Sequence, residues 1–311
     1  MRAVRFEGKA VRLVEAPAPE GPGVRVRIRG CGICGSDIAM LDSGFPMAGI
    51  PGHELAGELD DGTPVAIEPL APCGHCEFCL RGDYQVCRSG VAMIFGVGRD
   101  GGMADEVIVP ERALVRLPRR VRVEDACLVE PLAVALHGMR RANLRGNERV
   151  CIVGGGPIGQ SAVAASVAAG CETALVARHP AQVEAGRRLG AVEAKGEYDV
   201  AAECAGTPSA TAECCERLRP NGTLLLLAAF WDALTLPGIP VAAKELVIVT
   251  ASMYGRFGAS RDVDAAAALL AARPEIAECL ITHRFPLAQA GAAFAAARDR
   301  RGGAIKVVLE P

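Results

Sequence analysis

This chain of 311 residues has few aromatic side chains and a net charge close to zero. Phe, Trp and Tyr together make up 4% of it, so no aromatic-lined pocket can be traced along the sequence. The formal net charge is only −2, which argues against a nucleic-acid binder held by phosphate contacts and against a polybasic membrane-surface protein. Half of the residues are apolar and 23% are charged, a balance typical of a globular protein.

Long apolar runs and signal-like segments are missing as well. The longest uncharged stretch, 151–171, includes five glycines, a proline and a glutamine, so we do not interpret it as a membrane span. The first residues are charged and alternating, unlike a secretory signal. The chain has 13 cysteines, an odd number, and several of them have the spacing of metal ligands. We therefore expect a cytoplasmic protein in a reducing compartment.

Short alternating runs mark the first third of the chain. Residues 24–29 read Val-Arg-Val-Arg-Ile-Arg, which places apolar and basic side chains on opposite faces of an extended strand. Gly and Pro interrupt this third at short intervals. We expect residues 1 to about 120 to form mostly antiparallel β structure, and we expect a further strand over 304–309 at the end of the chain.

Strands and helices alternate through the middle of the chain. One expected helix begins at Pro157 and is followed by Gly170, which are typical first and terminating residues. The expected strands are 149–153, 172–177, 198–203 and 223–229, and the expected helices are 157–169, 180–189, 208–218 and 262–272. This alternation predicts parallel βαβ units and a doubly wound sheet. We expect an α/β protein in which 143–277 form a dinucleotide-binding domain inserted into a domain made of 1–142 and 278–311.

A group of four cysteines has the pattern C-x2-C-x2-C-x7-C and comprises Cys73, Cys76, Cys79 and Cys87. Closely spaced thiolates are typical ligands of a tetrahedral zinc ion, and a site closed by four thiolates is structural. We therefore predict a structural zinc lobe over 73–87. Iron–sulfur proteins carry a similar C-x2-C-x2-C-x3-C-P pattern, but here the last gap is seven residues and no proline follows. The acidic balance of charge disfavours a zinc ribbon that binds nucleic acid.

A second set of metal-binding side chains is divided between short motifs. Cys34 lies in GICGSD, and His53 and Glu54 lie in GHE. A catalytic zinc keeps three protein ligands and one open position, so a thiolate and an imidazole leave a third place for a carboxylate. Glu54 and Glu130, the latter in the run VEPL, are the two candidates for that place. The sequence leaves the choice between them open.

A glycine-rich loop follows the expected strand 149–153 and opens the next expected helix. The run GGGPIG fits the pattern G-x-G-x-x-G, in which glycines allow a tight turn and the close approach of a pyrophosphate. The N-terminus of the helix then supplies free N–H groups and a partial positive charge. The residues expected to bind a dinucleotide are Gly154, Gly156, Pro157, Ile158 and Gly159.

The end of the second strand of this domain distinguishes the two nicotinamide cofactors. NAD-binding proteins carry Asp or Glu there, which holds the ribose 2′-hydroxyl. This strand ends at Ala177, Arg178 and His179, without an acid. We expect Arg178, with His179 beside it, to pair with a 2′-phosphate, which favours NADP over NAD. The alternative is an arginine that merely faces solvent.

Together these motifs resemble those of the zinc-containing medium-chain dehydrogenase/reductase family, to which many alcohol dehydrogenases belong, over nearly the whole chain. GICGSD, GHE, EPLAPCGHC, VEPL, GGGPIG and the ending AIKVV look most like the polyol (sorbitol-type) and threonine dehydrogenase branches. The resemblance implies a GroES-like β domain and a Rossmann domain, with the active site in the cleft between them. It also implies a homodimer or homotetramer with a small-molecule alcohol or ketone as its substrate.

The resemblance further implies roles for individual residues. The implied ligands of a catalytic zinc are Cys34, His53 and either Glu54 or Glu130. Ser36 would take the proton from the alcohol. Many relatives carry a histidine two residues after the Asp of GSD, where this chain has Ala39. The proton relay beyond Ser36 is therefore not carried over to this chain.

The sequence thus predicts a zinc-dependent enzyme with two zinc ions per chain, which transfers hydride between NADP(H) and a secondary alcohol or polyol. A zinc-independent enone or quinone reductase of the same superfamily is one alternative, but such enzymes lack these metal ligands. A non-catalytic zinc- and NADP-binding protein is the alternative from another class. Metal analysis separates them, because two zinc ions per chain support the dehydrogenase and one supports either alternative.

Overall fold

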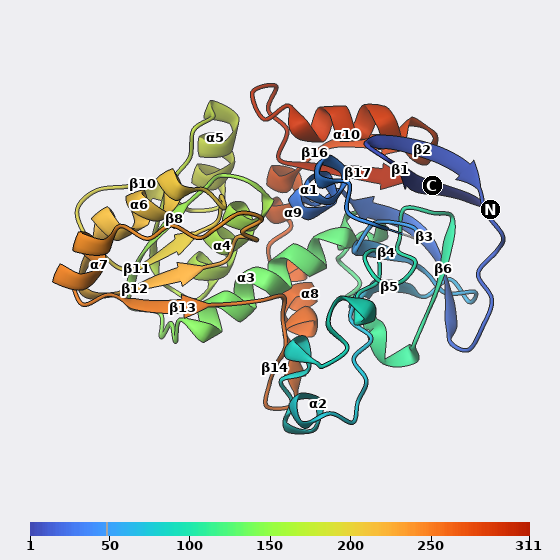
Figure 1. Ribbon diagram of the computed structural model, residues 1–311, viewed down its shortest axis with the longest axis horizontal. Coiled ribbons are helices and arrows are strands. Elements are labelled where there is room, and N and C mark those ends of the chain that lie inside the picture. The colour runs from blue at the N-terminus through green and yellow to red at the C-terminus, as the bar shows by residue number, and fades with distance from the viewer. Residues whose placement is uncertain (48) are drawn as a thin grey trace. The chain divides into compact units, whose positions relative to one another are not determined.

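The computed structural model describes residues 1–47 and 49–311 and is drawn as a ribbon in Figure 1. The described chain divides into two compact units. Unit 1 comprises Met1–Glu130, Gly255–Ala277 and Ile281–Pro311, and unit 2 comprises Pro131–Tyr254 and Glu278–Leu280. The sequence-based division grouped 255–277 with the dinucleotide-binding domain. In the structure, Arg261 of this segment makes an ion pair with Glu68 of unit 1.

Unit 1 consists mainly of β-strands, as the alternating runs predict. In β3, Val26 and Ile28 are buried while Arg27 and Arg29 are exposed, so one face of the strand belongs to the core. The strands of this unit are β1 (Arg2–Glu7), β2 (Ala10–Glu15), β3 (Val24–Gly32), β4 (Glu54–Glu58), β5 (Pro64–Ile67), β6 (Glu106–Val109), β7 (Leu114–Arg116), β14 (Arg256–Phe257), β15 (Ser260–Arg261), β16 (Ile281–Pro286) and β17 (Lys306–Glu310).

Seven of these strands form one sheet with the order β16-β17-β3-β4-β5-β7, and β6 also pairs with β3. All pairings in this sheet are antiparallel except that between β16 and β17. The helices of unit 1 are α1 (Gly35–Ser43), α2 (Glu77–Arg81), α8 (Asp262–Ala272) and α10 (Ala290–Arg298), while α9 (Glu275–Leu280) has residues in both units. The expected helix 262–272 and the expected terminal strand are therefore present.

Unit 2 is a parallel sheet with helices between its strands, as the alternation predicts. Its strands are β8 (Arg149–Val153), β9 (Glu172–Val176), β10 (Val192–Glu193), β11 (Tyr198–Glu203), β12 (Leu218–Leu226) and β13 (Val247–Thr250), and its helices are α3 (Val129–Arg141, which starts in unit 1), α4 (Pro157–Ala168), α5 (Pro180–Arg188), α6 (Pro208–Arg217) and α7 (Gly238–Ala243). Strand β12 begins earlier than the expected 223 because Leu218 pairs with Tyr198 across a register shift.

The strand order of unit 2 determines where a ligand can bind. The order is β10-β9-β8-β11-β12-β13, and neighbouring strands run parallel (Figure 1). The chain builds outward from β8 in one direction and from β11 in the other, so the order reverses between these two strands. Ligands of open α/β sheets bind beyond the carboxyl ends of the strands at such a reversal. Among the described residues, no helix combines the length and apolarity required to cross a bilayer.

Candidate metal and cofactor sites

Three of the predicted metal ligands lie together in unit 1. Cys34 is the N-cap residue of helix α1, two positions after the end of β3, and His53 immediately precedes Glu54, the first residue of β4. Antiparallel pairing of β3 with β4 aligns Gly32 with Glu54 and so joins the two motifs. One ligand atom each from Cys34, His53 and Glu54 lies within 4.8 Å of the others. A Cβ atom on Gly32 would stand 2.1 Å from Glu54 Oε2, so a larger residue there would displace this carboxylate.

His53 is buried among groups of opposite charge. Its Nε2 lies 3.3 Å from Ser36 Oγ, and its Nδ1 lies 3.5 Å from Asp37 Oδ1. Asp37 Oδ2 accepts the N–H of Cys34 at 2.9 Å, which fixes the carboxylate at the first turn of α1. Burial lowers the pKa of His53, but the charges of Asp37 and Cys34 outweigh it and raise the pKa well above 6.5. The same negative groups also favour a metal cation, which would bind the neutral form of this imidazole.

Glu54 has a partner that sequence reasoning missed. The ammonium of Lys306 donates to both oxygens of Glu54, at 2.6 and 2.5 Å, and to the backbone oxygen of Ile33 at 3.1 Å. Both side chains of the ion pair are almost completely buried. Burial lowers the pKa of Lys306, but the charge of Glu54 raises it above the ordinary value. The ending AIKVV, which contains Lys306, was the only signal in the sequence for this pair.

Glu130, the other candidate carboxylate, lies near this cluster but outside its tightest group. It is the last residue of unit 1 and is 8% exposed. Burial raises the pKa of Glu130 to about 7, while the charge of His53 lowers it and that of Glu54 raises it. Among the described residues, the group with all ligand atoms within 4.8 Å includes Glu54 and not Glu130.

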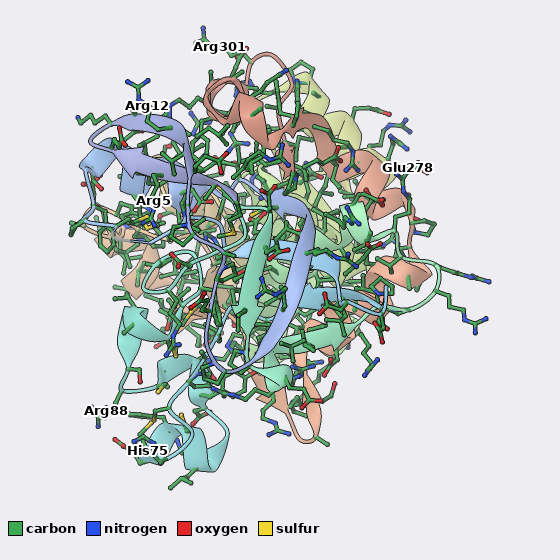
Figure 2. All side chains as sticks on the ribbon, turned by 90° about the vertical axis from the view of Figure 1, so that its right-hand side faces the viewer. Arg5, Arg12, His75, Arg88, Glu278 and Arg301 are labelled. Carbon is green, nitrogen blue, oxygen red and sulfur yellow. The ribbon has the colours of Figure 1, made fainter. Side chains whose placement is uncertain are left out.

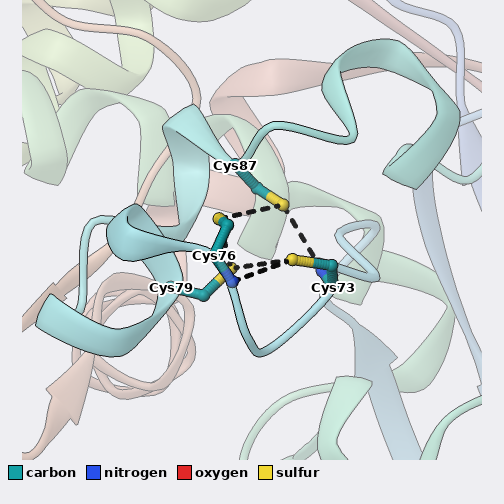
Figure 3. A group of neighbouring side chains, drawn as sticks. All are labelled: Cys73, Cys76, Cys79 and Cys87. Atoms are coloured by element: carbon teal, nitrogen blue, oxygen red, sulfur yellow. Dashed lines mark hydrogen bonds between the residues drawn. The ribbon is translucent and has the colours of Figure 1, made fainter.

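The four cysteines of the predicted lobe point toward one another (Figure 3). The sulfur of Cys79 lies 3.9 Å from that of Cys73 and 3.5 Å from that of Cys76, and Cys76 Sγ lies 3.9 Å from Cys87 Sγ. A disulfide would require about 2.05 Å. Four thiolates that each stand about 2.3 Å from one tetrahedral zinc are about 3.8 Å apart. The observed sulfur distances therefore fit one shared ion.

Backbone donors in the same lobe favour a thiolate. The N–H groups of Cys73 and Ser89 each donate to Cys87 Sγ at 3.4 Å. Burial raises the pKa of Cys87, but these donors outweigh it and lower the pKa to about 6. His75 is exposed, with Nδ1 3.0 Å from the backbone oxygen of Cys73, and is not one of the four grouped ligands. The side chains of His75 and Arg88 are labelled in Figure 2.

The glycine-rich loop lies in unit 2 where the strand order reverses. It connects β8 to α4, whose N-cap is Gly156 and whose first residue is Pro157, followed by Ile158. Gly154 has φ +114°, and a Cβ atom on Gly159 would stand 1.7 Å from Gly154 O, so the turn requires glycine at both positions. A Cβ atom on Gly156 would meet nothing within 4 Å. The loop therefore leaves open space beside the helix N-terminus, as a pyrophosphate requires.

The residues expected to select the cofactor follow β9. Arg178 is exposed, and His179 is half-buried as the N-cap residue of α5. Gly155 packs against this region, because a Cβ atom there would stand 2.6 Å from Ala177 Cβ and 2.7 Å from Gln182 Cβ. The glycine loop and the end of β9 are thus direct neighbours within unit 2, as a dinucleotide site at this edge of the sheet requires.

Known proteins with related sequences span nearly the whole chain. The family model for the alcohol dehydrogenase GroES-like domain matches residues 21–119. L-idonate 5-dehydrogenase of Vitis vinifera is 31% identical over 335 residues, which cover 92% of this chain and 87% of that protein. Sorbitol dehydrogenase of Bacillus subtilis (strain 168) is 27% identical, and the match covers 99% of this chain and 96% of that protein.

Solved structures have the same fold over their whole length. Galactitol-1-phosphate dehydrogenase from Escherichia coli is 27% identical with a TM-score of 0.87, and the match covers 100% of both chains. A zinc-binding dehydrogenase from Sinorhizobium meliloti 1021, solved bound to NADP, is 26% identical with a TM-score of 0.86 and coverage of 100% of this chain and 99% of that one. This chain therefore belongs to the zinc-containing medium-chain dehydrogenase/reductase family, in its polyol dehydrogenase branch, and is a nicotinamide-dependent oxidoreductase that interconverts alcohols and ketones.

Proposed function

We propose that Cys34, His53 and Glu54 hold the zinc ion at which this oxidoreductase acts. The observation that carries the proposal is the convergence of their three ligand atoms within 4.8 Å. Three ligands leave one position open, where zinc supplies a Lewis acid that lowers the pKa of an alcohol hydroxyl. Asp37 orients the imidazole of His53 from the Nδ1 side, at 3.5 Å, as carboxylates do beside zinc-bound histidines.

Two neighbouring residues complete the proposed site. Ser36 Oγ lies 3.3 Å from His53 Nε2, so its partly exposed hydroxyl is placed to relay the proton that the alcohol loses, accepting that proton as it releases its own to water. Glu130 is the second carboxyl beside the metal ligands, and its pKa of about 7 suits a group that gains and loses a proton near neutrality. Lys306 contacts both oxygens of Glu54, so the carboxylate that would bind zinc is also held in place by a buried ammonium.

A second zinc ion is proposed for Cys73, Cys76, Cys79 and Cys87. Its support is the fit of the sulfur distances of 3.5–3.9 Å to a tetrahedral site closed by four thiolates. Such a site has no open position for a substrate, so its role is to hold the lobe folded. The complete protein would then hold two zinc ions per chain.

The proposed cofactor is NADP, bound by Gly154, Gly156, Pro157, Ile158 and Gly159, with Arg178 and His179 at the 2′-phosphate. It would accept or donate the hydride. We predict that wild-type protein uses NADP+ with a KM at least about tenfold lower than that for NAD+, because a guanidinium pairs strongly with phosphate. Arg178→Ala should raise the KM for NADP+ by about tenfold and leave the KM for NAD+ nearly unchanged. An equal effect on both cofactors, or none, would reject the assignment.

The proposed substrate is a polyol or sugar-like secondary alcohol. The relatives are named for idonate, sorbitol and galactitol 1-phosphate, each of which carries several hydroxyl groups. The test is an assay of purified protein that follows NADPH absorbance with a panel of polyols, sugar acids, sugar phosphates and simple secondary alcohols. We expect turnover of at least one polyhydroxy substrate and weak turnover of simple alcohols. Efficient turnover restricted to simple alcohols would contradict the proposed substrate class.

We also propose that the protein is a homodimer or homotetramer. Strand β13 ends the six-stranded sheet, and its Val247 and Ile248 are 52% and 38% exposed. No charged residue or proline interrupts β13, although such residues commonly protect edge strands from pairing. Light scattering should therefore give a mass of two or four times 32.3 kDa. A monomeric mass at micromolar concentration would contradict this proposal.

A further inference from the structure

Glu203 is a buried carboxylate without a role in the chemistry proposed above. It is the last residue of β11, and its side chain is fully buried. Its Oε1 accepts the N–H groups of Ala205 at 3.0 Å, Gly206 at 2.8 Å and Thr207 at 3.4 Å. One oxygen atom therefore gathers three consecutive backbone donors and fixes the turn over 204–207.

This turn leaves the sheet beside the glycine-rich loop. Glu203 is in register with Val153, the last residue of β8, and the strand order reverses between β8 and β11. The 204–207 turn and the loop that starts at Gly154 therefore begin at neighbouring points of the same sheet edge. In doubly wound sheets the crevice at this reversal receives the ligand.

The turn and the loop are packed without free space between them. The N–H of Cys204 donates to Val153 O at 2.9 Å. A Cβ atom on Gly154 would stand only 3.0 Å from Ala205 N. Movement of the turn toward the loop would therefore have to displace the backbone at Gly154, and movement away from it would stretch the hydrogen bond from Cys204 to Val153. Ala205 itself is exposed and so forms part of the surface next to the glycine-rich loop.

On the basis of the proposed function, we infer that Glu203 is a positioning residue for the nicotinamide dinucleotide. By binding the N–H groups of the 204–207 turn, it holds this turn against Gly154 and thereby keeps the glycine-rich loop in the shape that accepts a pyrophosphate. Without this acceptor, three backbone donors lose their partner, and the turn must rearrange toward water. The loop beside it then loses its support.

The second carboxylate oxygen of Glu203 shows whether the turn requires a negative charge or only a hydrogen-bond acceptor. Glu203 Oε2 is buried and makes no hydrogen bond among the described residues. Burial raises the pKa of Glu203, although the three N–H donors lower it. The turn therefore requires an acceptor oxygen at the position of Oε1, but it makes no use of the oxygen at the position of Oε2. Glutamine supplies that oxygen, whereas alanine supplies none.

The test measures cofactor affinity in the full-length, metal-loaded protein by titration of the bound nicotinamide fluorescence with NADPH and NADH. Glu203→Ala should raise the Kd of the preferred cofactor by at least about tenfold, and Glu203→Gln should keep it within about threefold of wild type. Tyr198→Phe is the matched control at the opposite end of β11. It removes the acceptor of the Lys195 N–H, 2.8 Å away, and should lower Tm by about 2–4 °C with an unchanged Kd.

Each outcome decides between the proposals. If wild type binds neither cofactor, the proposed function fails, whereas equal Kd values for wild type and Glu203→Ala overturn only the role of Glu203. A Kd raised as much in Tyr198→Phe as in Glu203→Ala would show a general loss of stability and would also overturn it. If Glu203→Ala does not fold, Glu203→Asp, whose shorter side chain withdraws the acceptor, takes its place with the same expectation. Zinc content should stay at the wild-type value throughout, because Glu203 lies in unit 2.

Discussion

The buried ion pair between Lys306 and Glu54 makes the stability of the protein sensitive to the loss of either charge. Both side chains are almost fully shielded from solvent, and the ammonium contacts both carboxylate oxygens. Removing one member of such a pair leaves an uncompensated charge in the interior, which costs about 3–5 kcal/mol. We predict that Lys306→Met lowers the free energy of unfolding of the metal-free protein by about this amount, measured by denaturant titration.

Two further variants control this prediction. The double variant Lys306→Met/Glu54→Gln removes both charges and should recover much of the lost stability. Lys195→Met breaks an ion pair with Glu193 in which both side chains are more than two-thirds exposed, so it should leave stability nearly unchanged. The account of the buried pair would be contradicted by a Lys306→Met variant as stable as Lys195→Met.

The same residues mark how far sequence reasoning reaches at this scale. Cys34 and His53 could be singled out because their motifs are local and chemically distinctive. The pairing of Lys306 with Glu54 could not, because the two residues are 252 positions apart and meet only through the sheet order β17-β3-β4. The distances that favour Glu54 over Glu130 depend on the same long-range pairing. The sequence therefore left the third ligand open.

At the scale of elements, we expect the fold of the cysteine lobe to depend mainly on metal binding by its four cysteines. Helix α2 has five residues, none of them buried, so packing contributes little to its folding. We predict that Cys76→Ser lowers the metal content by one equivalent per chain and lowers Tm, because a four-thiolate site loses a ligand. Metal analysis by mass spectrometry and calorimetry would measure both effects. The control Cys171→Ser, in a buried cysteine outside both ligand groups, should retain the full metal content.

Four strands and three helices of unit 2 follow closely from hydrophobic periodicity and from Pro and Gly positions, whereas α3, α7, β10 and β13 were not predicted. Strand β8 has the expected bounds, and helix α4 ends one residue before the expected 169. The larger difference is the early start of β12, which arises because Leu218 pairs with Tyr198 across an irregularity in the register. Local sequence patterns contain no information about such pairing, since register depends on the neighbouring strand.

At the scale of the whole molecule, the candidate metal sites and the candidate cofactor site lie in two separately packed units. Unit 1 carries the cluster of Cys34, His53 and Glu54 and the four-cysteine lobe, and unit 2 carries the glycine-rich loop at the reversal of strand order. The fold class and these motifs were predictable because each rests on a local pattern. The membership of 255–277 was harder to predict, because it depends on contacts such as that between Arg261 and Glu68.

The central claim is that Cys34 belongs to a catalytic zinc site distinct from the four-cysteine site. The most direct test measures zinc content and hydride-transfer rate together for wild type and Cys34→Ser. We predict two zinc equivalents in wild type and one in the variant. The rate should fall at least about a thousandfold, because the metal contributes several kcal/mol to stabilising the transition state. A Cys34→Ser variant that keeps two zinc equivalents and the wild-type rate would contradict the claim.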